Sequence, residues 1–538
     1  MRPTREKRLV AYYSDLRDYL GTLESEGKLN RISAPINKDT ELHPLVRLQY
    51  RGLPEEQRKG FLFESVTDAK GKRYSIPVAV ACVAGSRDIY ALGMQCAPDQ
   101  ISEKWTNAQV NPIPPILVQD GAVQERVIYR EDGGEGLGML PVPISTPGFD
   151  NGPYTTSSNW VTKDPDTGVR NVGNYRGQIK GPWRIGCFSS SPPQHIRKHW
   201  FKHKERGTPL PAAMVIGVTP NISFAAVSKI PYGVDEYAVA GGVAGEPVRL
   251  VKCKTVDLEV PANAEIVIEG EIPTDELEQE GPFGEFPGYM SKKDVAFFMN
   301  VKCITCRNEP IYEAFISQFP PSESSKIRAI GAENVILKLL KVDRGLDVIE
   351  VALHESSGSW GYCVISMRKR DNDDPKKVFD ALMKSYPYGK IYVVVDEDVD
   401  ARDPDSVNWA LSFGMQPSRD VRIERTPVNS LDHSLVSPFG ETTRDPTFVE
   451  KAEASVLYID ATRKWPYPPT SLPAKPYMVK ALSIWKELGL PPLSDLHKPW
   501  HGYTLGYWNE EFQQEVDLAV KGEYYSTGEK AAKNRKKV

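Results

Sequence analysis

The chain has 538 residues, of which 40% are hydrophobic and 26% are charged, a composition typical of globular proteins with more than one domain. Its formal net charge of -4 gives no reason to expect nucleic-acid binding, and its longest apolar runs are too short to cross a membrane. The N-terminus lacks the apolar core of a signal peptide and the seven cysteines are scattered, so we expect a cytoplasmic protein with reduced thiols.

Near the N-terminus, four apolar residues recur at the spacing of one helix face and a glycine follows them, which predicts a helix that ends at this glycine. The sequence from there to about residue 120 is rich in proline, and we expect it to consist largely of loops. We assign residues 1–120 to an N-terminal α/β domain. The apolar residues are Leu16, Tyr19, Leu20 and Leu23, and the glycine is Gly27.

Short runs rich in β-branched residues between residues 121 and 325 predict a domain made mainly of strands. Within it, Cys303 and Cys306 form a CxxC pair, but this pair lies inside a predicted strand and no second pair accompanies it. Because a structural zinc site needs four ligands, we interpret both cysteines as structural. The clearest predicted strands are 212–218, 264–272 and 297–306.

After residue 325 the pattern changes to alternating helices and strands, which is typical of an α/β domain with a partly parallel sheet. We assign residues 326–490 to this domain, and we expect residues 491–538 to form a C-terminal helix and a mobile basic tail. The whole chain is therefore predicted to be an α/β (α+β) protein. The predicted helices are 325–342, 375–385, 478–489 and 510–522, and the predicted strands are 347–355 and 390–400.

Familiar nucleotide-binding and hydrolase motifs are missing: no GxGxxG follows a predicted strand, and there is no Walker loop, HExxH or GxSxG. Polar residues instead gather in four stretches beside glycine or proline, where backbone can approach a ligand closely. Asn171, His195 and Glu236 would offer an amide, an imidazole and a carboxylate, which suit Mn²⁺, Mg²⁺ or Fe²⁺. Each alone is more often a surface or capping residue, and spacing does not bring them together. The stretches are 170–178, 192–200, 229–242 and 280–285.

These stretches, in this order, resemble the UbiD family of reversible decarboxylases. The resemblance covers about residues 10–490 and includes "RNVGNYR", "PQHI", "IPYGVDEYAVAG", "EGPFGEFPGY" and "VVVDEDVDARDPDSVNWAL". It implies a prenylated FMN cofactor, supplied by a flavin prenyltransferase, whose phosphate is held by K⁺ and by a divalent metal (Mn²⁺, or else Mg²⁺ or Fe²⁺). It also implies that residues 121–325 form a flavin-binding domain that is similar to a split barrel.

The resemblance further implies site residues through their match to the family's motifs. Val172 and Lys229 differ from the residues that some members carry there, near the implied K⁺ site. The implied catalytic residues are Arg176, Glu280 and Glu285; the implied metal ligands are Asn171, His195 and Glu236; and the other implied cofactor contacts are Val172, Gln194, Ala225, Ala226, Ser228 and Lys390, with Arg176 among the cofactor contacts as well.

Decarboxylation of an aromatic acid explains why such residues would be needed. Loss of CO₂ leaves an electron pair on an sp² carbon, and no side chain is a good sink for it, so a cofactor must take that role. We expect Glu280 to pair with Arg176 and stay ionised. We expect Glu285 to be desolvated, with a raised pKa that lets it protonate the carbon that CO₂ leaves.

The substrate is less defined, although the resemblance favours the branch of the family that acts on aromatic acids. Candidate substrate contacts are Ser317, His433 and Phe439. The basic residues 197–206 and the basic tail could hold a coenzyme A thioester, as in phthaloyl-CoA decarboxylases, but two solvated basic faces are the simpler interpretation. An FMN-dependent redox enzyme and a non-catalytic subunit of a multi-subunit aryl carboxylase stay open, although the complete Arg-Glu-Glu set argues against both.

One late helix carries a broad apolar face that must be buried somewhere. Its own chain or a neighbouring subunit could cover this face. The resemblance favours a homo-oligomer, either a dimer or a hexamer. The residues of this face are Val479, Leu482, Ile484 and Trp485.

Overall fold

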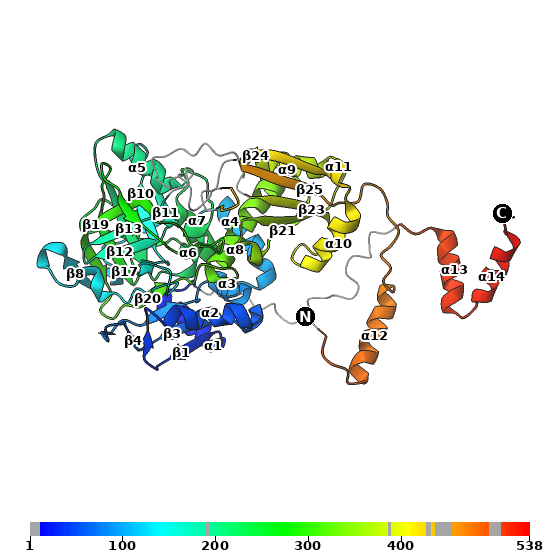
Figure 1. Cartoon of the computed structure of the whole chain (residues 1–538), viewed down its shortest axis with the longest axis horizontal. Coiled ribbons are helices and arrows are strands. Elements are labelled where there is room, and N and C mark those ends of the chain that lie inside the picture. Colours follow the sequence, from blue (N-terminus) through cyan, green and yellow to red (C-terminus); the bar gives the residue numbers. More distant parts are fainter. Residues whose placement is uncertain are drawn as a thin grey trace, which may run out of the picture.

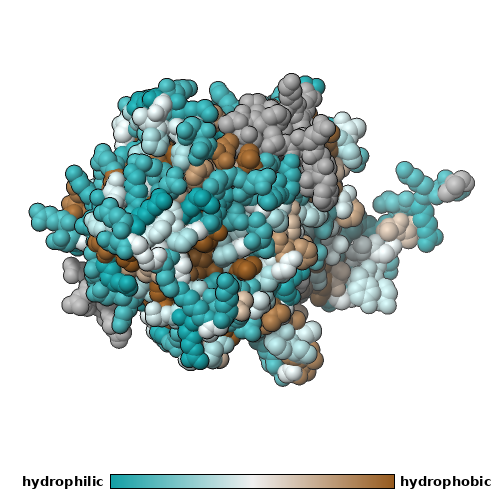
Figure 2. Space-filling view, turned by 60° about the vertical axis from the view of Figure 1, so that its left-hand side comes forward, coloured by the Kyte–Doolittle hydropathy of each residue, from teal (hydrophilic) through white to brown (hydrophobic). Residues whose placement is uncertain are grey.

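The computed structural model of the chain shows five sheets, none of them closed, with helices between and around them (Figure 1). No helix within the described residues is long and apolar enough to span a membrane. On the face drawn in Figure 2, hydrophobic residues form small groups among hydrophilic ones. The described residues are 11–189, 194–385, 389–426, 432–435, 454–493 and 507–537.

The first helix, α1 (Leu16–Ser25), forms where the sequence predicts it. All four apolar residues of the predicted face are buried. Asp15 caps the helix by accepting a hydrogen bond from the backbone N–H of Asp18. Just beyond the helix, Gly27 has a φ of 67°, a left-handed conformation that glycine adopts readily and that ends the helix.

The stretch that we expected to consist of loops contains three further helices, so this prediction was wrong. Pro44 lies in the first turn of α2, where a missing N–H costs no intrahelical hydrogen bond. Pro98 likewise lies just before α4. The helices are α2 (Leu42–Gly52), α3 (Arg87–Met94) and α4 (Ile101–Val110).

A sheet with the strand order β1-β3-β6-β20 joins the N-terminal region to a strand from much later in the chain. β20 runs parallel to β6, with Ala314 opposite Val80. The N-terminal and central regions therefore share a sheet, and the predicted domain limits stay predictions. The strands are β1 (Leu29–Ile32), β3 (Gly60–Phe63), β6 (Val78–Val80) and β20 (Tyr312–Ala314), and a small sheet beside them contains β2 (Ile36–Asn37), β4 (Val66–Thr67) and β5 (Arg73–Tyr74).

The central region is built on a ten-stranded sheet in which all pairs are antiparallel. Its longest strand, β19, contains the CxxC cysteines, and both are buried. The three strands predicted here are confirmed as β14, β17 and β19. The strands are β8 (Arg126–Tyr129), β9 (Tyr154–Thr155), β10 (Asn159–Lys163), β11 (Arg170–Asn174), β12 (Gly177–Gly181), β13 (Arg184–Cys187), β14 (Leu210–Ile216), β17 (Ile266–Ile272), β18 (Glu278–Glu280) and β19 (Asp294–Cys306).

Three helices pack against strand β11 of this sheet, and two of them begin at residues that the resemblance singles out. They are α5 (His195–Glu205), α6 (Pro220–Val227) and α7 (Glu236–Ala244). A small sheet lies nearby and contains β7 (Ile116–Leu117), β15 (Arg249–Lys252) and β16 (Glu259–Pro261).

The C-terminal α/β region has the predicted partly parallel sheet, in the order β21-β22-β23-β25-β24. β22, β23 and β25 are parallel. Neighbouring residues alternate between two cores: Ile365 packs with α8 and α9, and Val364 packs with α10. The elements are α8 (Glu323–Leu337), α9 (Asp374–Ser385), α10 (Pro404–Gly414), α11 (Pro417–Asp420), β21 (Val348–Leu353), β22 (Tyr362–Met367), β23 (Ile391–Asp396), β24 (Val421–Thr426) and β25 (Ala454–Asp460).

The last three helices project away from the rest of the molecule (Figure 1). None of them contains a buried residue. Part of the basic end of the chain, which we expect to be mobile, lies in α14, whose Lys530 pairs with Glu511 of α13 at 3.0 Å. The helices are α12 (Lys475–Glu487), α13 (Glu510–Val520) and α14 (Tyr524–Lys533).

Candidate active site

Arg176 holds two glutamates that lie about a hundred residues later in the chain. Its Nε donates to Oε1 of Glu280 over 2.6 Å, and its Nη1 donates to Oε1 of Glu285. The side chains of Arg176, Glu280 and Glu285 are 8%, 1% and 9% exposed, respectively. The structure therefore brings together, away from bulk water, the three residues that the resemblance implies as catalytic.

The catalytic loop, residues 281–291, follows Glu280 and carries Glu285, and backbone pairing fixes it on each side. Glu280 is the last residue of β18, which pairs with β19. Further along, the N–H of Glu285 donates to the carbonyl of Tyr289 over 2.9 Å. Gly281 has a φ of 91°, a conformation that favours glycine and turns the chain between the two acids.

Two residues that sequence reasoning missed hold the peptide after Glu280. The Nδ2 of Asn151 donates to the carbonyl of Gly281 over 2.6 Å, and the N–H of Gly281 donates to the hydroxyl of Tyr154 over 3.1 Å. This hydroxyl in turn donates to Oδ1 of Asn151 over 2.9 Å. Both residues lie in "DNGPY", which reads as an ordinary turn, so the sequence offered no signal for this role.

Aromatic rings surround the guanidinium of Arg176. Its central carbon lies 3.9 Å from the ring centroid of Phe188, 4.8 Å from that of Phe283 and 5.9 Å from that of Tyr154. These rings attract the cation and exclude water from it. A carboxylate beside this cation thus interacts with it more strongly than it would in water.

Burial is the largest influence on the pKa of Glu280. It raises the pKa of this carboxyl above its ordinary value, although Arg176 acts in the opposite direction. Its Oε2 has no hydrogen-bond partner among the described residues. Burial also lowers the pKa of Arg176, but the two carboxylates outweigh this effect, so the net shift is upward.

The three implied metal ligands lie on β11 and at the starts of two helices. His195 is the first residue of α5 and Glu236 is the first residue of α7, and the Nδ1 of His195 is 3.7 Å from Oε1 of Glu236. The N–H of Val172 donates to Oε2 of Glu236 over 2.8 Å. The buried Nδ2 of Asn171 has no partner among the described residues. Two helix N-termini thus meet here, and both favour an anion such as a phosphate.

This donor set fits a hard divalent cation that keeps ligands from outside the protein. Within the described part of the chain, no group of three or more His, Cys, Asp or Glu side chains could hold a metal ion. The set contains two such side chains and one amide, so water or phosphate would have to complete the shell. Two ligands that are each about 2.1 Å from one ion lie about 3–4 Å apart, and His195 and Glu236 meet this condition at 3.7 Å.

The residues implied at the K⁺ site lie at the end of α6. Ala225 and Ala226 belong to its last turn and Ser228 is its C-cap. Backbone carbonyls at a helix C-terminus favour cations. Gln194, another implied cofactor contact, directly precedes α5, and its Oε1 accepts a hydrogen bond of 2.7 Å from the hydroxyl of Ser189.

Lys390 and His433 lie at the boundary with the C-terminal region. The Nζ of Lys390 binds Oδ2 of Asp432 at 2.9 Å. Lys390 therefore contacts the segment 432–435, and it contacts neither the Arg176 trio nor the trio of implied metal ligands. The ring of His433 packs edge-on against Tyr289 of the catalytic loop, with centroids 5.5 Å apart.

Of the other two candidate substrate contacts, Ser317 hydrogen-bonds to Ser324 at 2.9 Å. Phe439 lies outside the described residues.

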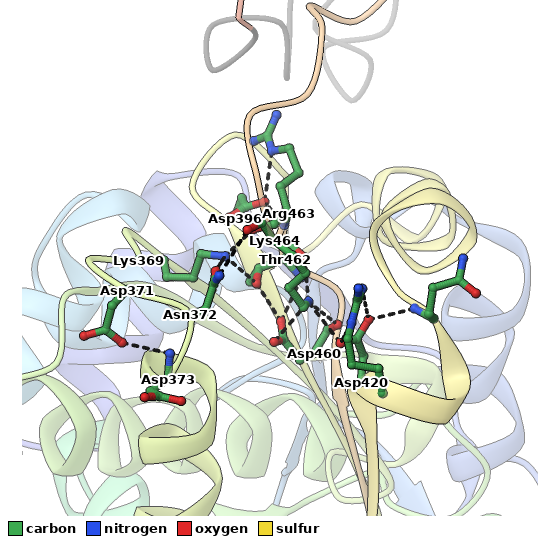
Figure 3. Close-up of polar contacts among 12 residues, drawn as sticks. Lys369, Asp371, Asn372, Asp373, Asp396, Asp420, Asp460, Thr462, Arg463 and Lys464 are labelled. Carbon is green, nitrogen blue, oxygen red and sulfur yellow. Dashed lines mark hydrogen bonds and ion pairs between the residues drawn. The ribbon is translucent and has the colours of Figure 1, made fainter.

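A second concentration of charged groups lies at the carboxyl ends of β22, β23 and β25 (Figure 3). Ligands often bind at this edge of parallel sheets. Here Lys369 donates to Thr462 at 3.1 Å, and Arg463 and Lys464 form ion pairs of 3.0 Å with Asp396 and Asp460. Because these cations bind partners within the cluster, the cluster closes the sheet edge and is a weaker candidate than the Arg176 trio.

Two family models match this chain. A family model described as the 3-octaprenyl-4-hydroxybenzoate carboxy-lyase Rift-related domain matches residues 116–320. The model of the C-terminal domain of the same carboxy-lyases matches residues 327–461.

Several solved structures have the same fold. The UbiD-class enzyme HmfF from Pelotomaculum thermopropionicum, in an evolved dimeric form in complex with prFMN, is 33% identical; the match covers 86% of this chain and 98% of that chain with a TM-score of 0.73. Vanillic acid decarboxylase from Sedimentibacter hydroxybenzoicus, in its closed form, is 28% identical; the match covers 89% of this chain and 100% of that chain with a TM-score of 0.76.

Proposed function

This chain belongs to the UbiD family of carboxy-lyases, and we propose that it catalyses the reversible, non-oxidative decarboxylation of an aromatic carboxylic acid with prenylated FMN as its cofactor. The buried ion-paired trio of Arg176, Glu280 and Glu285 is the observation that carries this proposal. Hydride transfer by an unmodified flavin does not require such a trio. A non-catalytic subunit would have no reason to keep it buried and paired.

The protein's own groups would orient the acid and handle the proton. Prenylated FMN, when bound, supplies the electron sink that no side chain offers. Arg176 attracts the substrate carboxylate and fixes the positions of both glutamates. Glu285 holds the proton for the ring carbon, and Glu280 keeps Arg176 in place from its more buried position.

We assign cofactor binding to the groups around the two helix N-termini. Asn171, His195 and Glu236 would hold a divalent cation, with Mn²⁺ as the first candidate and Mg²⁺ or Fe²⁺ as alternatives. Carbonyl groups near Ala225, Ala226 and Ser228 would hold K⁺, whose charge suits the end of α6. Val172, Gln194 and Lys390 are assigned to the cofactor by resemblance to the family alone.

A free aromatic acid is the favoured substrate class, and an aryl-CoA thioester is the second candidate. The basic residues of α5 are largely occupied: Lys202 pairs with Asp164 at 2.7 Å, and Lys198 and Lys204 lie 4.4 and 4.9 Å from the rings of Tyr232 and Trp200. They therefore give little support to a site for coenzyme A. The contact between His433 and Tyr289 supports His433 as a substrate contact.

Co-expression with a flavin prenyltransferase tests the proposal directly. The purified protein should carry a flavin with the mass and absorption of prenylated FMN. It should release CO₂ from at least one member of a panel of vanillic, 3,4-dihydroxybenzoic and phthalic acids and phthaloyl-CoA. A protein that binds unmodified FMN and reduces it with a nicotinamide, without releasing CO₂, would instead be a redox enzyme.

Reversibility predicts isotope exchange. A site that stabilises the ring carbanion after CO₂ departs must also stabilise it when CO₂ returns. We therefore expect ¹³C from concentrated bicarbonate to enter the carboxylate of unreacted substrate during decarboxylation, as measured by mass spectrometry. A preparation that decarboxylates but incorporates no label would contradict reversibility.

The exposed C-terminal helices support a homo-oligomer. Val479 and Ile484 of α12 are 50% and 44% exposed, and a water-exposed apolar helix face favours association. We expect light scattering to show an oligomer, a dimer or a hexamer, for the full chain, and a smaller species after residues 475–538 are removed. As a control, Lys480→Glu on the same helix should leave the mass unchanged. A monomeric full-length chain would exclude the assembly.

A further inference from the structure

Each decarboxylation consumes one proton from solvent, because a carboxylate and a proton become an arene and CO₂. Under the function proposed above, on which this inference rests, Glu285 gives its proton to the ring carbon and must be reprotonated before the next turnover. Phe188, Phe283 and Tyr154 surround its partner Arg176 and exclude water on that side. The protein therefore needs another path from solvent to Glu285.

A cavity of about 530 Å³ lies beside Asp150. Lys38 and Asp39 from the N-terminal region and Ile144 and Asp150 from the central region line it. Lys70 and Gly148, which also line it, are exposed, so the cavity opens to solvent. None of the residues implied by the resemblance lines this cavity, and nothing in the proposed chemistry uses it.

Asp150 connects this cavity to the catalytic loop. Its Oδ1 accepts a hydrogen bond of 3.1 Å from the N–H of Gly284, the residue before Glu285, and its Oδ2 accepts one of 2.6 Å from the N–H of Thr146. Burial raises the pKa of Asp150 to about 6, although these N–H groups and Arg176 act to lower it. The other charged groups around the cavity are Lys38, Asp39 and Lys70, and Lys38 is neutralised by Asp39 at 2.6 Å.

Three buried polar atoms close to Asp150 or to Gly284 lack a protein partner. The buried Oγ of Ser145, Oγ1 of Thr146 and Nε2 of Gln318 have no hydrogen-bond partner among the described residues. Two of these side chains flank the same glycine, because a Cβ built on Gly284 would lie 2.8 Å from Oγ1 of Thr146 and very close to Cγ of Gln318. Buried polar atoms without a protein partner usually bind ordered water.

We propose that Asp150 relays protons from solvent in this cavity to Glu285 through ordered water beside Gly284. A proton from solvent binds the Asp150 carboxylate. It then passes along the water, one O–H bond breaking as the next forms, to the carboxylate of Glu285. Asp150 returns to its ionised form, and no oxidant or reductant takes part. Asp150 touches neither substrate nor cofactor and acts through Glu285, so it is a positioning residue.

Single-turnover and steady-state rates separate this role from a structural one. The test uses the full chain loaded with cofactor and the acid of the panel above that the wild type converts fastest. In Asp150→Asn the first turnover should keep its rate within about threefold, because Glu285 already carries its proton, whereas steady-state turnover should fall by about 10²-fold. Formate at tens of millimolar should restore part of the steady-state rate, and Asp150→Glu should retain most of it.

Asp39→Asn is the matched control, because Asp39 lines the same cavity but binds Lys38 and the N–H of Ala69 and not the catalytic loop. It should behave like the wild type in both phases. Equal losses in the first and later turnovers of Asp150→Asn, without rescue by formate, would show that Asp150 only holds the loop and would overturn the relay. If Asp150→Asn does not fold, Asp150→Ser, which keeps an acceptor for Gly284, replaces it in the same comparison.

A titration of the cofactor-free chain distinguishes failure of the relay from failure of the proposed function. With ¹³C-labelled aspartate carboxyls, the NMR signal that is missing from Asp150→Asn should titrate near pH 6 and should move in Glu285→Gln. A wild type that releases no CO₂ from any acid would refute the function and leave this coupling measurable. A signal that titrates near the ordinary aspartate value of about 4 and does not move in Glu285→Gln would overturn the relay by itself.

Discussion

Glu285→Gln is expected to lower kcat by at least about 10²-fold, the usual effect of removing a positioned acid. Glutamine keeps the size of the side chain and an oxygen that can accept from Arg176, but it has no acidic proton for the ring carbon. The loop should stay in place, because the N–H of Glu285 binds the carbonyl of Tyr289 through the backbone alone. Steady-state release of CO₂ measures the loss.

A matched variant and a second assay make this prediction specific. Glu278→Gln changes another glutamate just before the same loop, one that pairs with Lys180 at 3.0 Å and Arg184 at 3.1 Å and not with Arg176, so kcat should change little. Flavin and metal content of Glu285→Gln should match the wild type. Near-normal turnover of Glu285→Gln, or rapid exchange of the ring proton of the product with D₂O, would contradict the role of Glu285 as the acid.

Much of the fold could be predicted because apolar periodicity reports burial directly. The four apolar residues of α1 are buried as their spacing indicated, and the alternation after residue 325 gives the partly parallel sheet. The proline-rich stretch before residue 120 could not be predicted in the same way. A proline in a first helical turn, such as Pro44, and a proline in a loop look alike in sequence.

The candidate site could be predicted only in part, because its residues are far apart in the chain. Arg176 and Glu280 are 104 positions apart, and no periodicity connects them, so only the order of motifs shared with a family suggested their contact. Burial of a single carboxyl depends on its whole surroundings, so the sequence could not show that burial raises the pKa of Glu280. The side chains of Asp150 and Asn151 form hydrogen bonds with backbone groups of the catalytic loop, and no pattern of residues in the sequence indicates such bonds.

The two trios are connected through one segment of chain. Asn171 lies in β11, and Arg176 follows a few residues later, just before β12. The backbone of Val172, between them, binds Glu236. A loss of the metal ligands should therefore disturb the cofactor site first and leave the Arg176 trio largely in place, since Asn151, Tyr154 and the pairing of β18 hold that trio independently.

His195→Ala is expected to remove the bound divalent metal and the flavin together. Changing even an indirect support of a metal ligand typically costs 10–100-fold in affinity, so removing the only imidazole of this donor set should cost at least as much. The alanine would also leave Glu236, a buried carboxylate, without the group that lies 3.7 Å from it, while the helix N-terminus would remain. Metal analysis and flavin absorbance of the purified variant measure both losses, and decarboxylation should fall with them.

His203→Ala is the control for His195→Ala, because His203 lies on the same helix, is partly exposed and binds Thr208 at 3.0 Å through its ring, away from Glu236. It should keep metal, flavin and activity. Loss of flavin with retained metal in His195→Ala would place the metal elsewhere, and full retention of both would refute the assignment of Asn171, His195 and Glu236. The imidazole of His195 forms no part of a hydrophobic core cluster, so the cofactor-free variant should melt near the temperature of the cofactor-free wild type. This comparison would attribute the loss of flavin to the site itself, because bound flavin and metal would raise the melting temperature of the loaded wild type.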